Sequence, residues 1–111
     1  MTPFQIEQQD RCGVVRLLSD LTAEIVPQLQ TALREVLEAG VNEFRFDLAQ
    51  VAMVDSSGLG LLIAASNSVN RLQGKIEVAN VSTDIFRLLH SMRLVDRLHV
   101  HSPNPQDACH G

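Results

Sequence analysis

The sequence predicts an α/β domain in which helices pack on a mostly parallel sheet of four to five strands. Strand-like and helix-like hydrophobic patterns alternate along the chain after two initial strands. A helix between two strands returns the chain to the end of the sheet where the first strand began, so the two strands run parallel, and such crossovers are right-handed. The chain has 111 residues, of which 45% are hydrophobic, enough for one packed core. We therefore expect a single domain over residues 1–111, with a flexible tail from about residue 103.

The first half of the chain predicts two strands, a helix and the turns between them. Alternating apolar residues in the first twenty positions predict two adjacent strands or a β-hairpin, with a turn at residues 10–13. Helical spacing then predicts a helix from Val26 to about Ala39. Pro27 falls in its first turn, where proline is tolerated, and Gly40 lies where a helix would end.

The second half predicts a strand, helix, strand, helix and strand in that order. Apolar alternation indicates a strand over residues 44–48, followed by a polar junction and a second helix that ends at Gly74. The wide apolar stripe of this helix indicates that more than half of its surface is buried. A short strand follows at residues 75–79, Ser82 supplies cap chemistry for a third helix, and a last strand is expected near residues 95–100.

Composition excludes several classes of partner. The formal net charge is −4, so the chain has no overall attraction for the phosphates of nucleic acids or for anionic membranes. Four Phe and no Tyr or Trp leave few side chains on which bases could stack. The N-terminus is neither basic nor apolar, and no long apolar run occurs. We expect a cytoplasmic protein that binds neither nucleic acid nor membrane.

Cysteines and histidines give only a weak signal for a metal. Cys12 and Cys109 lie near opposite ends of the chain, and a cytoplasmic protein would keep both reduced. On a strand, His99 and His101 would share one face, with Cys109 within possible reach. A tail position for Cys109 is the simpler interpretation, and we expect no metal site.

The junction before the second helix contains the residues of this sequence that are most suited to a chemical function. Its residues are Val54-Asp55-Ser56-Ser57-Gly58-Leu59-Gly60. Loops at the carboxyl ends of parallel strands are where α/β folds place working residues. Either serine is expected at the N-cap or in the first turn, where it could simply cap the helix. Alternatively, a phosphate ester would add about two negative charges beside Asp55, near the positive end of the helix dipole.

Enzymatic interpretations of this junction fail on spacing. A hydrolase elbow requires glycine two residues before the nucleophile, but Val54 and Asp55 precede the two serines at that distance. A phosphate-binding loop requires Gly-Lys-Ser/Thr, and Lys75 is the only lysine. The third glycine of a dinucleotide fingerprint is missing as well. We expect no catalytic activity and no cofactor.

In this setting, the junction resembles that of a stand-alone STAS domain of the bacterial anti-sigma factor antagonist family. The resemblance extends over nearly the whole chain and implies the STAS fold. It rests on Leu21-Thr22 before the first helix, Asp47-Leu48 at a strand end, residues 51–60, residues 74–81 with Ile85-Phe86-Arg87-Leu88-Leu89, and residues 94–100.

The resemblance implies a partner-switching module that is not an enzyme. Ser56 would be phosphorylated by a serine kinase with a histidine-kinase-like ATPase fold, which also acts as the anti-sigma factor. The unphosphorylated chain would bind this kinase, the phosphorylated chain would release it, and a PP2C-type serine phosphatase would restore binding. The residues implied at the partner-binding surface are Thr22, Asp55, Ser57, Gly58 and Leu59, with Gly58 permitting close approach of the partner.

Some positions depart from the family pattern, and two other functions remain open. Ser19 and Thr22 replace a usual glycine and a usual Asp or Asn before the first helix. A usual glycine near Met92 and Arg93 is missing, so the third helix is expected to end differently. The main alternative function is a non-switching STAS subunit of a lipid-transport ABC complex, and a nucleotide-binding sensor is a more distant one.

Overall fold

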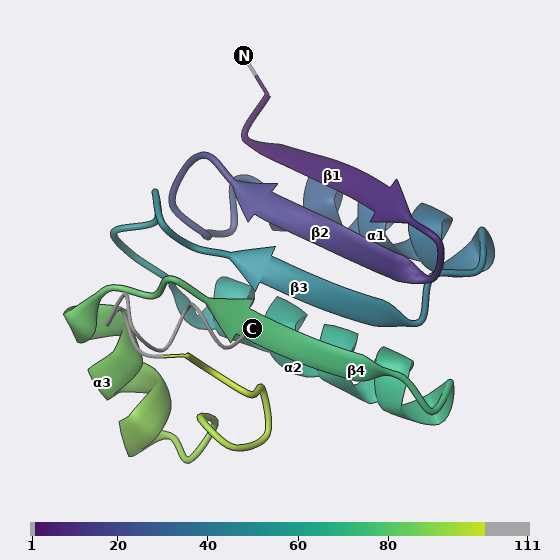
Figure 1. Ribbon diagram of the computed structural model, residues 1–111. Helices are drawn as coiled ribbons and strands as arrows, with labels where there is room; N and C mark the ends of the chain where they lie inside the picture. The colour runs from purple at the N-terminus through teal and green to yellow at the C-terminus, as the bar shows by residue number, and fades with distance from the viewer. Residues whose placement is uncertain (1, 102–111) are drawn as a thin grey trace.

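A computed structural model describes residues 2–101 of the chain. Within this part, a four-stranded mixed sheet carries helices mainly on one face (Figure 1). The elements in chain order are β1 (Phe4–Gln9), β2 (Cys12–Leu17), α1 (Val26–Glu38), β3 (Glu43–Asp47), α2 (Ser56–Arg71), β4 (Lys75–Ala79) and α3 (Thr83–Ser91). The predicted α/β class and the order of these elements are confirmed. The expected tail from residue 103 lies outside the described residues.

The sheet has the strand order β1-β2-β3-β4. β1 and β2 form an antiparallel hairpin whose turn contains Asp10, with φ of 55°. β2, β3 and β4 are parallel neighbours, joined by crossovers that contain α1 and α2. The strand expected near residues 95–100 is reduced to one bridge between Val78 and Val100, because the residues before Val100 form turns that bury Leu94 and Leu98.

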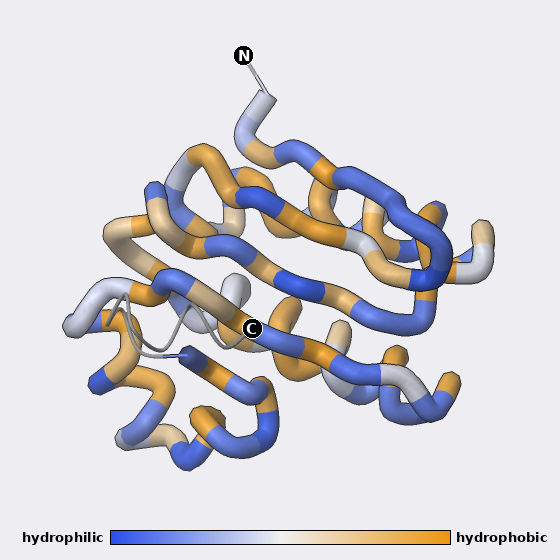
Figure 2. The backbone as a smooth tube through the Cα atoms, viewed as in Figure 1, coloured by the Kyte–Doolittle hydropathy of each residue, from blue (hydrophilic) through white to orange (hydrophobic). Residues whose placement is uncertain are grey.

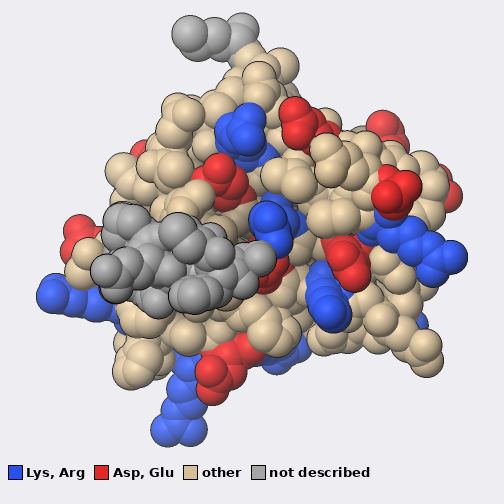
Figure 3. All heavy atoms as spheres, viewed as in Figure 1, with Lys and Arg blue, Asp and Glu red and all other residues tan. Residues whose placement is uncertain are grey.

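The two faces of the sheet have opposite character. The strands alternate between apolar and polar residues (Figure 2), and large apolar side chains among them, such as Phe46, Leu17 and Val78, are fully buried. The helices α1 and α2 cover one face of the sheet (Figure 1). The other face carries mixed charges (Figure 3), among them Arg45 and Glu77, whose side chains pair at 3.1 Å. Such exposed ion pairs contribute little stability. The core therefore lies between the sheet and its helices. No helix within residues 2–101 is long and apolar enough to cross a membrane.

The ends of α2 and α3 correct two expectations about glycine. Arg93 adopts φ of 59° after α3, and the Leu94 N–H donates to the Leu89 carbonyl at 2.9 Å. This is the usual left-handed helix closure, so the expected different ending is wrong: an arginine adopts the conformation in place of glycine. After α2 the left-handed residue is Gln73, with φ of 59°. Gly74 is instead required for close packing, since a Cβ there would overlap the backbone of Asn42.

Asp55 joins the first turn of α2 to the loop before α1. It is the N-cap of α2, and its Oδ1 accepts a hydrogen bond from the Gly58 N–H at 2.9 Å. Its Oδ2 accepts one from the Ala23 N–H, also at 2.9 Å, across 32 positions of sequence. Both serines lie in the first turn, which is one of the two positions expected for them, and the Asp55 carboxylate rather than a serine caps the helix. The hydrogen bonds from Gly58 and then Ala23 favour the ionised carboxylate and lower the pKa of Asp55.

Asp20 makes the reciprocal connection from the loop before α1. Its Oδ1 accepts hydrogen bonds from the N–H groups of Ala52 and Met53, at 2.9 and 3.2 Å. Between the two carboxylates, the backbone of Leu21 donates to the Met53 carbonyl at 3.0 Å and accepts from the Asp55 N–H at 3.2 Å. We call this arrangement of Asp20, Asp55 and the backbone groups they bind the carboxylate clasp. It fixes the two loops relative to each other.

Gly58 allows α2 to start directly against the loop before α1. A Cβ at this position would overlap the carbonyl oxygen of Leu21 and lie 2.8 Å from its Cγ. Gly58 is buried, so its role is internal packing rather than the partner approach expected from the sequence. Gly60, one half-turn further along α2, is exposed and has open space where a Cβ would stand.

These two glycines predict opposite effects of the same substitution. Gly58→Ala should lower the free energy of unfolding by about 1–3 kcal/mol, because backbone atoms of Leu21 must move. Gly60→Ala should raise it by up to about 1 kcal/mol, because alanine favours the helix and meets no obstacle. Urea unfolding measures both. Equal effects of the two substitutions would contradict the close packing of Gly58.

The carboxylate clasp predicts a dependence of stability on pH. Because the folded-state pKa of Asp55 is lowered, its stabilising contribution is present above its unfolded pKa, about 3.9, and is lost as pH falls through the folded pKa. Asp55→Asn keeps one acceptor oxygen and should lower the melting temperature at neutral pH. The difference from the unsubstituted chain should shrink below about pH 4. Thermal unfolding followed by circular dichroism tests this, and a difference independent of pH would contradict it.

Candidate functional site

The candidate site lies where the carboxyl ends of the three parallel strands meet. β2, β3 and β4 all point to the same edge, at the left of Figure 1, and α2 begins there. The loops at residues 18–25 and 48–55 form this edge and are joined by the carboxylate clasp. The predicted placement of the Ser56 junction between a strand and a helix is confirmed.

Ser56 is the first residue of α2, and its side chain is exposed. Its hydroxyl makes no hydrogen bond to another described residue, so it is available to a visiting molecule. The residues on either side are fixed: Asp55 by the carboxylate clasp, and Val54 by burial. Ser56 therefore presents a free hydroxyl on a rigid base, beside the N–H groups of a helix terminus that favour an anion.

The segments that build the site contain no cationic side chain. Neither residues 17–33 nor residues 46–70 include a lysine or arginine. Their charged residues are Asp20, Glu24, Asp47 and Asp55. Backbone hydrogen bonds, from Gly58 and then Ala23, lower the pKa of Asp55 further and so favour its negative charge. An anion attached to Ser56 would thus find no arginine or lysine from these segments to neutralise it.

The structure separates the residues that the family resemblance placed at the surface. Ser57 is exposed, and Thr22 is half-buried in the loop that meets Asp55 through Ala23. Thr22 also opens the turn before α1, because its carbonyl accepts hydrogen bonds from two later N–H groups. Leu59 is only 8% exposed and packs in the core, because this helical position faces the sheet. The expected surface position of Leu59, like that of Gly58, is corrected.

Two residues of the site were not identified from the sequence. Asp20 holds the loop before α2 through Ala52 and Met53, which are 32 and 33 positions away in sequence. An aspartate between a strand and a helix is a usable signal, but the sequence does not show which backbone groups it reaches. Met53 is 54% exposed, although the nearby apolar residues Val51 and Val54 are both buried.

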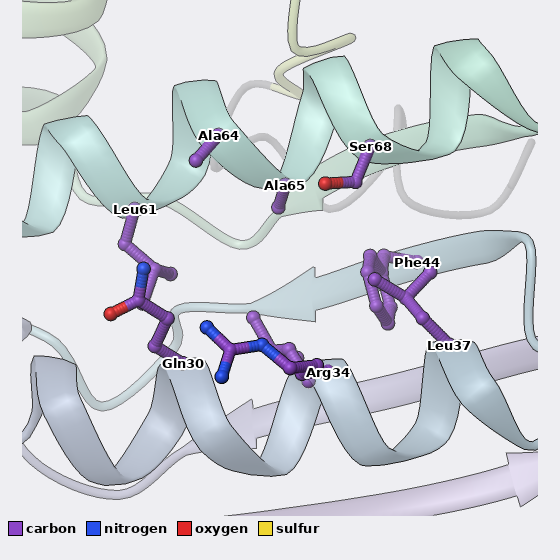
Figure 4. Close-up of a pocket in the computed structure, with 9 residues that line it drawn as sticks. Gln30, Arg34, Leu37, Phe44, Leu61, Ala64, Ala65 and Ser68 are labelled. Atoms are coloured by element: carbon purple, nitrogen blue, oxygen red, sulfur yellow. The ribbon is translucent and has the colours of Figure 1, made fainter.

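Two concave regions of the described surface lie away from Ser56. A groove of about 160 Å³ runs between α1 and α2 (Figure 4), with Leu33, Phe44 and Leu61 among its apolar lining and Arg34 among its polar lining. A hollow of about 480 Å³ lies over the charged face of the sheet, beside Cys12. Neither is lined by residues of the loops that carry Ser56.

The cysteine and histidines near that hollow are engaged in other ways. His101 Nε2 lies 2.7 Å from Glu77 Oε1, and His99 Nδ1 lies 2.9 Å from the Ile76 carbonyl oxygen. Partial burial opposes ionisation of Glu77, but its contacts with His101 and an arginine outweigh this and lower its pKa. Burial, aided by nearby carboxylates, raises the pKa of Cys12 and keeps its thiol protonated.

Metal ligation is not indicated by this arrangement. Within residues 2–101, no three His, Cys, Asp or Glu side chains are placed to hold a metal ion together. Cys109, which the sequence placed within possible reach of the histidine pair, lies outside the described residues.

The amino-acid sequence matches known proteins over most of its length. The family model for the STAS domain matches residues 3–108. The anti-sigma-B factor antagonist of Staphylococcus epidermidis is 30% identical over 86 residues, covering 78% of this chain and 80% of that protein. The protein of the same name from Staphylococcus aureus is 29% identical over 92 residues, covering 83% of this chain and 85% of that protein.

Solved structures share the fold. A Thermotoga maritima protein assigned as an anti-sigma factor antagonist superposes with a TM-score of 0.85 at 18% identity, covering 96% of this chain and 92% of that one. The Bacillus cell fate determinant SpoIIAA in its phosphorylated form superposes with a TM-score of 0.76 at 19% identity, covering 96% of each chain. At these identities, the structures establish the fold alone.

The sequence match is the basis for the family assignment. It covers nearly the whole chain and includes the junction at residues 54–60. The resemblance to STAS domains is thereby confirmed, and this chain belongs to the STAS domain family.

Proposed function

We propose that this chain is an anti-sigma factor antagonist that switches partners when Ser56 is phosphorylated. The unphosphorylated chain binds an anti-sigma factor that is also a serine kinase with a histidine-kinase-like ATPase fold. Phosphorylation releases this partner, and a PP2C-type serine phosphatase restores binding. The observation that carries the proposal is the exposed Ser56 hydroxyl at the first position of α2, on a backbone fixed by the carboxylate clasp.

The relatives support this function. Two curated relatives of about the same length are named anti-sigma-B factor antagonists. SpoIIAA, which shares the fold, has been solved in an unphosphorylated and a phosphorylated form, and both superpose on this chain, with TM-scores of 0.70 and 0.76. A chain of this fold can therefore carry a phosphate without losing its architecture, as a surface switch requires.

The chemical step is a phosphoryl transfer in which this chain is the substrate. The Ser56 oxygen would attack the γ-phosphorus of ATP, forming the ester bond as the bond to ADP breaks and the hydroxyl proton is lost. The kinase supplies ATP and its magnesium, so this chain needs no nucleotide-binding loop. The phosphatase then uses water to cleave the ester, which regenerates the serine hydroxyl and free phosphate.

The effect of the phosphate on binding follows from the charge of the site. The ester would add about two negative charges beside the ionised Asp55. The helix N-terminus stabilises an anion locally, so the fold tolerates the group. A partner that packs against this surface must instead remove water from an unneutralised dianion, because the loops of the site offer no cation. Binding weakens while the fold persists.

We propose that the site residues exposed or half-exposed to solvent contact the partner directly in the bound state. Ser57 follows Ser56 in α2, and Thr22 precedes Ala23, whose N–H binds Asp55. We propose that both contribute polar groups and that Asp55 contributes its charge. Gly58 and Leu59 act from inside, by allowing α2 to pack on Leu21 and on the core. We propose that the partner recognises the rigid surface that these buried residues create.

Phosphorylation of Ser56 is tested with radiolabelled ATP and the histidine-kinase-like serine kinases of the source organism, each purified separately. One of them should transfer a single phosphate to the chain. Ser56→Ala should abolish the transfer, and Ser57→Ala, as the matched control, should retain it. Full labelling of Ser56→Ala would contradict the site assignment. No labelling by any kinase would favour a non-switching STAS subunit, such as one in a lipid-transport ABC complex.

Release of the partner is tested with a charge mimic. Ser56→Asp should weaken binding to the same kinase by at least about tenfold in Kd, or about 1.4 kcal/mol, because a charge enters a contact that excludes water. Asn70→Asp adds the same charge near the opposite end of α2 and should leave Kd nearly unchanged. Calorimetric titration measures both variants. Equal affinity of Ser56→Asp and the unsubstituted chain would show that charge does not control release.

A further inference from the structure

We propose that Met53 is an apolar anchor of the surface that docks on the kinase, and that Asp20 is the positioning residue that presents it. This inference rests on the proposed function, because it names how the partner of Ser56 recognises the chain. The partner surface opposite Met53 would be an apolar socket beside the kinase active site. Four observations carry this inference: the exposure of Met53, its fixed backbone, its position relative to Ser56 and the charge of its surroundings.

Met53 is the most exposed large hydrophobic side chain among the described residues. It is 54% exposed, followed by Leu72 at 49% and Met92 at 47%. Leu72 and Met92 are C-cap residues that follow α2 and α3, so their exposure accompanies the end of a helix. Met53 lies instead within the loop that leads to Ser56. The chain thus provides two exposed apolar side chains of similar size as natural controls.

The exposure of Met53 is imposed by a fixed backbone. The chain enters the core at Val51, which is 4% exposed, emerges at Ala52 and Met53, and returns to the core at Val54, which is 7% exposed. Asp20 Oδ1 accepts hydrogen bonds from both emerging N–H groups, at 2.9 and 3.2 Å. The Met53 carbonyl accepts from the Leu21 N–H at 3.0 Å. Both polar backbone groups of Met53 are therefore hydrogen-bonded. Because the loop that carries its exposed side chain is already ordered, binding a partner would cost little further conformational freedom.

Met53 lies close to Ser56 along the chain, so a kinase that reaches Ser56 also comes near Met53. Met53 precedes Ser56 by three positions, a span of at most about 10 Å even in a fully extended chain. Residues 46–70 contain no lysine or arginine, so this segment itself offers a partner no cationic contact. An exposed methionine offers a flexible, polarisable apolar contact that adapts to a shallow socket. Phosphate on Ser56 would place charge beside this apolar contact, which links anchoring to release.

The inference is tested by steady-state phosphorylation with the kinase identified through Ser56. Met53→Ala should raise KM by about fivefold or more, with little change in kcat, because the anchor contributes to docking rather than to phosphoryl transfer. Asp20→Ala, which removes the oxygen that accepts from Ala52 and Met53, should also raise KM. The double variant should raise KM by less than the product of the two single effects, because both substitutions act through one contact. Met92→Ala and Leu72→Ala should leave KM unchanged.

A second measurement does not depend on a substitution. With methyl-labelled methionine, the Met53 methyl resonance should shift or broaden in the complex with the kinase, whereas that of Met92 should stay in place. The proposal is overturned if Met53→Ala raises KM no more than Met92→Ala, or if the Met53 resonance is unaffected in the complex. Transfer of phosphate to Ser56 in the same experiment shows that the proposed function still holds. If no kinase modifies Ser56, both proposals fall.

Discussion

The site depends on one interaction, the acceptance of two backbone hydrogen bonds from two different loops by the carboxylate of Asp55. One oxygen binds the Gly58 N–H at the start of α2, and the other binds the Ala23 N–H before α1. A serine or asparagine at this position would have one acceptor oxygen in place of two, so the helix start and the second loop would no longer each have an oxygen of their own. Because the bonds favour the ionised form, the residue that organises the site also gives it negative charge.

Rigidity and charge together make a surface suited to a chemical switch. Like Asp55, Asp20 accepts backbone hydrogen bonds that cross from one loop to the other. Because Gly58 has no side chain, the start of α2 packs directly against Leu21. The serine hydroxyl then stands on a backbone that has little freedom to lose, at a helix end that tolerates an anion. A phosphate attached at this point would change what a partner encounters without requiring the domain to refold.

The features of this domain that could be predicted from the sequence are those set by neighbouring residues. The elements followed from hydrophobic periodicity, and β4 and the start of α1 at Val26 lie where the spacing places them. Contacts between distant segments could not be predicted. The cap by Asp55 rather than a serine, the reach of Asp20 and the contact of Gly58 with Leu21 all depend on how two loops meet in space. Leu59 belonged to the predicted apolar stripe, but its inward direction followed only from the docking of α2 on the sheet.

The central claim is that phosphorylation changes the charge of a fixed surface and leaves the fold beneath it intact. The most direct test compares backbone amide spectra of the unphosphorylated and the Ser56-phosphorylated chain by nuclear magnetic resonance. The account predicts shifts confined to the two loops of the site and the first turn of α2, with the Gly58 and Ala23 amides still protected from solvent exchange. Shifts spread through the sheet, or loss of that protection, would show that phosphate acts by rearranging the domain and would contradict the account.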